Sequence, residues 1–318
     1  IYDFETELQD TRFTRLQLRS FGPVPGVQDS FFLISMRAEK TPRLTFAMFS
    51  MPIHKDGHFI NINSGGGGLS NGLVVSTAKN PMLEPPFYLF SAFEQGNGAA
   101  LEFNGPIIPG RLHYRAFVAG GAGRFNGNIG GRFFASGEFN HTYGAGGALM
   151  YYALGRFGRW DSRYLYTPVP LALTLNIGGR YDQREFERFP AAYTSALFRY
   201  KRFQIIAEGF AKRELEFDSY QFAYNAMVGI LVWPKKIMIA ADIGQFYATE
   251  FKNAPAQLNA ELKRLGDVVQ WRAAVHYFLF GNTGLLSLLY TDQFQEQLAT
   301  NREDEFTKEL RLEAQFRF

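Results

Sequence analysis

The residues of this chain with the most versatile chemistry are its five histidines, since it contains no cysteine. His54 and His58 are four residues apart, a spacing that on a helix face would suit a metal ion, but the Asp-Gly pair between them favours a turn. His113 and His276 have no Ser or Asp at a spacing that marks a catalytic dyad. The sequence also shows no nucleophile elbow and no cluster of metal ligands. We therefore expect no enzyme, no metal and no cofactor, and we interpret the histidines as polar wall or loop residues.

The charged residues recur at every second position. Residues 309–318 are the clearest case, with Leu310, Leu312, Ala314, Phe316 and Phe318 on one face and Glu309, Arg311, Glu313, Gln315 and Arg317 on the other. Residues 111–118, 171–182 and 269–280 alternate in the same way. Because successive side chains of a strand point to opposite faces, each segment predicts a strand with one apolar and one polar face.

Such alternation fits a soluble sandwich as well as a membrane barrel, and the connections favour the barrel. Short periplasmic turns alternate with long external loops in outer-membrane barrels. The short connections here are Glu39–Pro42, Gly105–Gly110, Tyr200–Arg202, Trp233–Lys236 and Gly281–Gly284. The longer ones are Phe21–Gln28, His54–Gln95, Gly120–Gly130, Gln183–Pro190, Phe251–Asp267 and Glu296–Thr307.

Composition points the same way. The chain has 33 Phe and 16 Tyr, which gather at strand ends and would suit the aromatic girdles of two membrane interfaces. The longest clearly apolar stretch, Ala226–Trp233, is far shorter than the roughly 20 residues of a membrane-spanning helix. The net charge of +3 is too small to suggest a nucleic-acid partner.

We therefore predict an all-β fold, a transmembrane antiparallel up-and-down β-barrel in the bacterial outer membrane. Fourteen strands are clear, beginning near residues 11, 29, 43, 97, 111, 131, 171, 191, 202, 220, 236, 268, 284 and 308. Residues 148–157 and 162–167 would add a hairpin, so the count is fourteen or sixteen, with sixteen favoured. Both counts are even and place both chain ends on the periplasmic side. No linker or change of composition is visible, so we expect one domain over residues 1–318.

The polar faces would line a lumen. The bases at inward positions are Arg15, Arg19, Arg37, Arg43, Arg111, Arg115, Arg132, Arg180, Arg199, Lys212, Arg272, Arg311 and Arg317. The inward acids are Glu39, Glu102, Glu138, Asp182, Glu208, Asp242, Glu309 and Glu313. A surplus of bases in a narrow channel would favour anions. The alternative is that facing bases and acids pair across neighbouring strands and stabilise the wall.

The long connection His54–Gln95 either folds inward and narrows the pore or forms a flexible external loop. Its glycines, Gly65–Gly68, would permit close packing against the wall. They do not predict a phosphate cradle, because no Gly-Lys-Ser/Thr sequence accompanies them. The basic residues available to a constriction here are His54, Lys55, His58 and Lys79.

Several phrases resemble the phosphate-selective porin O and P family. They are Gly-Arg-Leu-His-Tyr-Arg and Phe-Asn-Gly within residues 105–127, Arg-Tyr-Lys-Arg-Phe-Gln within 196–209, Leu-Val-Trp-Pro-Lys-Lys within 229–241, and Met-Pro-Ile-His within 43–54. The resemblance implies a sixteen-stranded, anion-conducting homotrimer whose third loop narrows the pore. The first hundred residues depart from the family pattern. Phe316 and Phe318 resemble the terminal strand that the barrel-assembly machinery reads. Outer-membrane lipids and lipopolysaccharide are the other expected partners.

Two functions remain open. The first is a passive diffusion channel for small hydrophilic solutes with a mild anion preference. The second is a structural barrel with a plugged, poorly conducting lumen that holds a partner protein or lipoprotein. The bulky inward residues Phe117, Phe134, Phe210 and Phe278 keep the second open. Conductance in planar bilayers would separate the two.

Overall fold

The computed structural model describes residues 16–38, 42–64, 79–83, 86, 99–121, 141–183, 188–216, 218–248, 266–281, 283–298 and 303–316. Within these ranges the chain forms a single sheet of fifteen strands. They are β1 (Leu16–Pro23), β2 (Phe31–Ala38), β3 (Pro42–His54), β4 (His58–Ser64), β5 (Ala99–Ile108), β6 (Leu112–Gly121), β7 (His141–Leu154), β8 (Val169–Gln183), β9 (Arg188–Lys201), β10 (Phe203–Glu214), β11 (Ser219–Trp233), β12 (Ile237–Tyr247), β13 (Val268–Phe278), β14 (Gly284–Gln295) and β15 (Glu305–Phe316).

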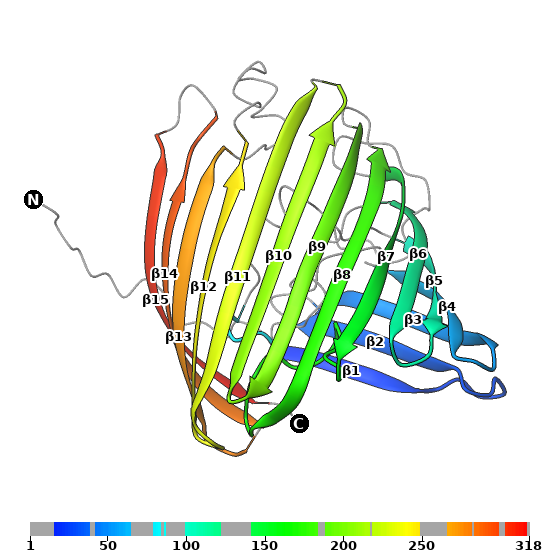
Figure 1. Cartoon of the computed structure of the whole chain (residues 1–318), viewed down its shortest axis with the longest axis horizontal. Helices are drawn as coiled ribbons and strands as arrows, with labels where there is room; N and C mark the ends of the chain where they lie inside the picture. Colours follow the sequence, from blue (N-terminus) through cyan, green and yellow to red (C-terminus); the bar gives the residue numbers. More distant parts are fainter. Residues whose placement is uncertain are drawn as a thin grey trace, which may run out of the picture.

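Each strand pairs antiparallel with its neighbours in the sequence, so the order in the sheet is β1 to β15 without a crossover. Figure 1 shows these strands tilted and curling into a barrel. The predicted up-and-down barrel is therefore confirmed. Because β1 and β15 are the edges of the described sheet, the choice between sixteen and fourteen strands depends on residues outside the described ranges.

The distribution of side chains is the inverse of that in a soluble protein. Along β11, the outward Phe222 and Ile230 are 51% and 45% exposed, whereas the inward Gln221 and Asn225 are 0% and 8% exposed. The same alternation holds along β10, β12 and β13. Large apolar side chains thus cover the outer face, and the buried polar and charged side chains lie on the inner face, which excludes the soluble sandwich and suits hydrocarbon outside the barrel.

Among the described residues, no helix is both long and apolar enough to cross a membrane.

The sequence prediction was wrong about the first connections. Residues 58–64, predicted as loop, form β4, which pairs with β3 across a tight turn at residues 55–57. That turn lies at the same end of the barrel as those after β5, β9, β11 and β13, which we call the short-turn end. Consequently β1 and β2 are joined at the short-turn end and β2 and β3 at the opposite end, the reverse of what the alternation of short and long connections predicted.

The expected hairpin over residues 148–157 and 162–167 does not form. Instead β7 continues to Leu154, and residues 155–168 follow without regular secondary structure before β8 begins. A left-handed Gly155, with φ of 49°, turns the chain away from the strand at this point. We call residues 155–168 the inward segment, because side chains along it are buried inside the barrel. The strand predicted near residue 131 lies outside the described ranges.

Candidate pore lumen

The lumen wall carries pairs of opposite charges. Asp242 on β12 faces Arg272 on β13 in the register, and the Arg272 Nε lies 3.0 Å from Asp242 Oδ1. Arg115 binds Glu102 through Nε at 3.0 Å and one terminal nitrogen at 2.7 Å. Arg180 pairs with Asp182, and Arg311 with Glu309 at 3.0 Å. Arg115 and Arg272 pair across neighbouring strands, as the alternative interpretation proposed. Arg180 and Arg311 instead pair with an acid two residues away on their own strand.

Of the other predicted lining residues, Arg199 also faces inward, on β9, where its guanidinium lies over the ring of Phe157. Arg199 is half-buried and donates to the carbonyl oxygen of Arg156 at 2.7 Å. Arg111 is an exposed residue of the turn between β5 and β6, rather than part of the inner wall. The side chains that lie outside the described residues are those of Arg15, Arg19, Arg37, Arg43, Arg132 and Arg317. The predicted surplus of bases therefore depends largely on residues that the structure does not describe.

The predicted constriction residues separate into two places. His54 ends β3, Lys55 lies in the following turn and His58 begins β4, so these three belong to a hairpin at the short-turn end. His54 Nδ1 lies 3.2 Å from Asp56 Oδ2, and His58 Nδ1 lies 3.1 Å from the hydroxyl of Tyr114. Three of the four basic residues predicted for the constriction therefore lie at this hairpin, and only Lys79 lies in the later part of the connection His54–Gln95.

Residues 79–83, from the later part of the connection, do fold inward. Asn80, Met82 and Leu83 are all less than 9% exposed. Lys79 donates to the carbonyl oxygen of Trp160 at 2.7 Å, so it contacts the inward segment. The long connection therefore folds inward at residues 79–83, as predicted, although the most deeply buried side chains there, Met82 and Leu83, are apolar rather than basic.

Hydrogen bonds hold the inward segment against both the wall and residues 79–83. The Arg163 amide donates to the Lys79 carbonyl at 2.9 Å, and the Tyr164 hydroxyl donates to the Asn80 carbonyl at 3.0 Å. On the wall side, the side chain of Gln204 donates to the carbonyl of Arg163. The Lys235 amide, in the turn after β11, donates to the Tyr166 carbonyl at 2.8 Å. Because both flanks are bonded, the segment is a fixed part of the lumen in this conformation.

An apolar cluster fills the lumen around the inward segment. Phe157 is fully buried, Leu165 is 2% exposed, and the Tyr164 ring packs edge-on against His276 at 5.1 Å. The lumen-facing residues of this cluster come from β8 to β14 and are Ala172, Leu197, Ile206, Met227, Leu231, Met238, Ala240, Ala274, Phe278, Leu285 and Leu289. Met82 and Leu83 complete it. The barrel therefore has an apolar plug on this side of its interior.

The sequence prediction missed the plug, although a signal was present. Near the short turns, residues 230–233 and 237–240 are apolar at both inward and outward positions. A strand that is apolar on both faces must bury both, so a second apolar body inside the barrel was foreseeable. The inward Phe117, Phe210 and Phe278 are each at most 5% exposed, and Phe134 lies outside the described residues.

Two arginines of the inward segment bring positive charge into the lumen. Burial, and then repulsion from Arg115, lowers the pKa of Arg159 to about 9. Burial likewise lowers the pKa of Arg163 to about 10, against the attraction of Glu208. Both guanidinium groups remain protonated at pH 7, since both values lie above it. The segment reaches from the β6 wall, where Arg159 lies beside Arg115, to the β13 wall, where Tyr164 packs against His276.

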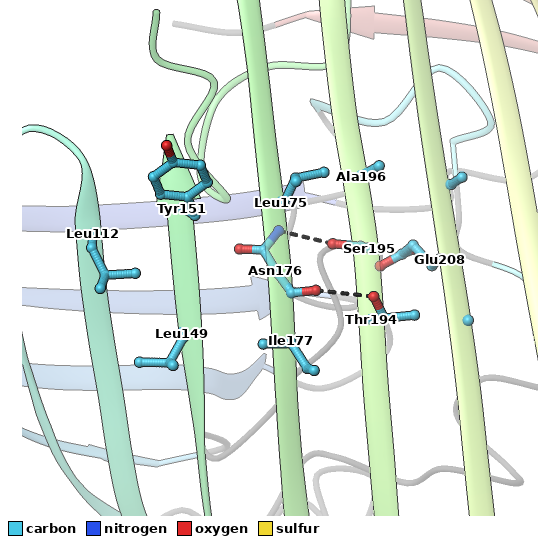
Figure 2. Close-up of a pocket in the computed structure, with 12 residues that line it drawn as sticks. Leu112, Leu149, Tyr151, Leu175, Asn176, Ile177, Thr194, Ser195, Ala196 and Glu208 are labelled. Carbon is cyan, nitrogen blue, oxygen red and sulfur yellow. Dashed lines mark hydrogen bonds between the residues drawn. The ribbon is translucent and has the colours of Figure 1, made fainter. Parts of the chain in front are cut away.

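The outer face also has a hollow, shown in Figure 2. It is a groove of about 650 Å³ with large apolar side chains from β7 and β8, Leu149, Tyr151, Leu175 and Ile177, beside small ones on β9 and β10, Thr194, Ala196, Ala207 and Gly209. Beneath it, the Asn176 side chain donates to the Ser195 hydroxyl at 2.8 Å. The groove opens on the outer face, and its lining also includes the buried Asn176, Ser195 and Glu208.

Comparison with solved structures identifies the fold. The outer membrane channel DcaP of Acinetobacter baumannii superposes with a TM-score of 0.58 and 12% identity, covering 96% of this chain and 84% of its own. An anion-selective porin from Comamonas acidovorans gives 0.56 and 9%, covering 95% and 87%. A porin refined at 1.8 Å resolution gives 0.55 and 12%, covering 96% and 92%. No family model and no curated protein matches the sequence.

These likenesses show a porin-like fold. Together with the apolar outer face, they place the chain in the bacterial outer membrane as an integral β-barrel. The resemblance to the phosphate-selective porins stays a prediction, as does the assembly signal: Phe316 is 54% exposed on the outer face of β15, and Phe318 lies outside the described residues.

Proposed function

We propose that this barrel is an outer-membrane diffusion channel for small hydrophilic solutes, with a mild preference for anions. The observation that carries the proposal is that Arg159 and Arg163 lie buried inside the lumen, on the inward segment. A fixed positive charge in a narrow, poorly hydrated passage attracts anions and repels cations. The porin-like fold supports the channel, and the buried arginines support the sign of its selectivity.

The conducting path is expected to be narrow. The plug occupies the lumen in front of β8 to β14, whereas the inward side chains of β15 remain accessible, with Arg311 28% and Glu309 42% exposed. Small ions would therefore pass beside the plug along β15. Larger solutes would be excluded while the plug stays in place.

The plug also favours a second candidate, a structural barrel with little conductance. Its apolar side chains do not favour water, so a plug that closes the lumen completely would leave the barrel silent. Such a barrel would act by holding a partner protein or lipoprotein. A homotrimer is compatible with either candidate and stays a prediction.

Single-channel recording in planar bilayers with a salt gradient tests the proposal. We expect small, steady current steps and a reversal potential biased toward the anion. The Arg159→Gln variant should reduce that bias, and Arg311→Gln should change the conductance. A purified, folded barrel that gives no steps would favour the structural candidate, and a cation-biased reversal potential would contradict the assigned selectivity.

A further inference from the structure

The short-turn end of the barrel carries a row of exposed bases. Arg111 lies in the β5–β6 turn, Lys201 ends β9 and Arg202 follows it in the β9–β10 turn, and Lys235 and Lys236 lie in the β11–β12 turn. The three turns contain no acidic residue. Within the described part of the chain, none of the five bases forms an ion pair. We call these five residues the basic rim.

Two lysines of the basic rim stand where the backbone favours glycine. Lys201 and Lys235 have left-handed φ angles of 52° and 64°. At the same end of the barrel, the corresponding turns use Gly57, Gly110 and Gly281, with φ of 88°, 72° and 61°. A side chain in this conformation is strained, whereas glycine adopts it freely. The lysines therefore persist at a cost in stability, which suggests that their charges act on something outside the fold.

Aromatic residues place the basic rim at the depth of the lipid headgroups. Tyr200, Trp233 and Tyr277 are 43%, 63% and 40% exposed on the outer face at this end. Aromatic rings of this kind mark the membrane–water interface of a barrel. The Lys201 ammonium lies 5.0 Å from the ring centroid of Tyr200, and that of Lys236 lies 5.8 Å from Tyr277. The ammonium groups are thus held beside the interfacial rings rather than far out in solvent.

From these observations we propose that the basic rim binds the phosphate groups of anionic phospholipids in the periplasmic leaflet of the outer membrane. Short turns face the periplasm in outer-membrane barrels, and that leaflet is built of phospholipid. Exposed cations next to an anionic membrane surface attract its headgroups at short range. The binding site is separate from the lumen and does not depend on whether the barrel conducts. Figure 1 shows the turns after β9 and β11 together at the lower end of the barrel.

The test uses the full-length barrel folded in an uncharged detergent and titrated with phosphatidylglycerol or phosphatidylcholine. Native mass spectrometry counts the bound lipid molecules. We expect phosphatidylglycerol to bind at least about a hundredfold more tightly than phosphatidylcholine, with the difference reduced in high salt. Replacing Lys201→Gly and Lys235→Gly together should weaken phosphatidylglycerol binding roughly twentyfold, since each base at an anionic surface contributes roughly fivefold.

The same double variant gives a second readout of opposite sign. Because glycine relieves two left-handed positions, its melting temperature in uncharged detergent should rise while its anionic lipid binding falls. Lys201→Arg with Lys235→Arg is the matched control, which keeps both charges and both strained positions and should bind like the parent. Lys236→Gln, at a residue without left-handed strain, should weaken binding without raising the melting temperature.

Three outcomes would overturn the proposal. One is equal binding of the two lipids by the parent barrel. Another is unchanged phosphatidylglycerol binding by the glycine variant. The third is a glycine variant that loses anion selectivity in bilayers but keeps its lipid affinity, because the bases would then serve the pore mouth.

Discussion

Phe157 is the residue whose removal should open the lumen most directly. It is fully buried in the inward segment, and two guanidinium groups stack on its ring, that of Arg199 at 4.5 Å and that of Arg163 at 5.2 Å. The ring therefore anchors the segment to the β9 wall. In the variant Phe157→Ala, the apolar contacts and both cation–π contacts disappear, while no wall residue changes. We expect the inward segment to detach from the β9 wall more often and the average conductance to rise.

The structure sets the size of this effect. Truncating a fully buried Phe to Ala typically costs about 3–5 kcal/mol, including the cavity that is left. The cation–π contacts are lost in the same step and are not added separately. Because about 1.4 kcal/mol corresponds to a tenfold change in an equilibrium constant, the ratio of released to docked segment should rise by roughly two to three and a half orders of magnitude. A segment released in about one parent molecule in a thousand would then be released in a large fraction of the variant.

Single-channel recording measures the fraction of time spent in large open levels. Phe189→Ala is the matched control: Phe189 is also an inward, 1% exposed ring under a cation, with Lys212 at 4.0 Å, but it lies on β9 away from the inward segment. It should lower the unfolding free energy without adding open levels. A folded Phe157→Ala barrel with unchanged open probability, or equal gains in the two variants, would show that the inward segment does not limit conduction.

Other perturbations test the wall, the outer face and the selectivity. Asp242→Asn leaves a buried guanidinium facing a neutral amide and should lower the unfolding free energy in urea by about 3–5 kcal/mol, whereas Asp292→Asn, at a partly exposed pair, should change it by less than about 1 kcal/mol. Ile177→Arg, at an outer residue that is 64% exposed, should cost about 2–4 kcal/mol in vesicles if it lies near the bilayer midplane; a neutral result would argue against lipid at this face. Because the pKa of Arg159 is lowered to about 9, the anion bias of the reversal potential should be present at pH 7 and shrink as the pH rises through about 9. A constant bias up to pH 10 would show that other charges set it.

Alternation predicted the barrel well because each long strand contacts two different solvents. In β13, Trp271 and Val275 face outward and Arg272 and His276 inward, as their positions in the sequence require. The same rule failed for β4, whose seven residues are too few to stand out beside a glycine-rich stretch. Because that one strand was missed, the turns that join β1 to β2 and β2 to β3 were each predicted at the wrong end of the barrel. Periodicity is therefore a better guide to the face of the sheet on which a residue lies than to the end of the barrel at which a turn lies.

The inward segment could not be found by periodicity, because residues 155–168 do not form a strand and their burial depends on partners far away in the sequence. Tyr164, for example, is buried by Asn80 on one side and His276 on the other.

The apolar inner rows nevertheless make a plug necessary. Residues such as Leu231 and Met238, at most 1% exposed, would each lose roughly 1.5–3 kcal/mol of burial free energy if water filled the lumen beside them. Several such residues line β9 to β14, so a fully open, water-filled lumen is strongly disfavoured while the wall keeps this sequence. Opening must then follow the polar side of the barrel along β15, and the Phe157→Ala variant should widen that path rather than empty the whole interior.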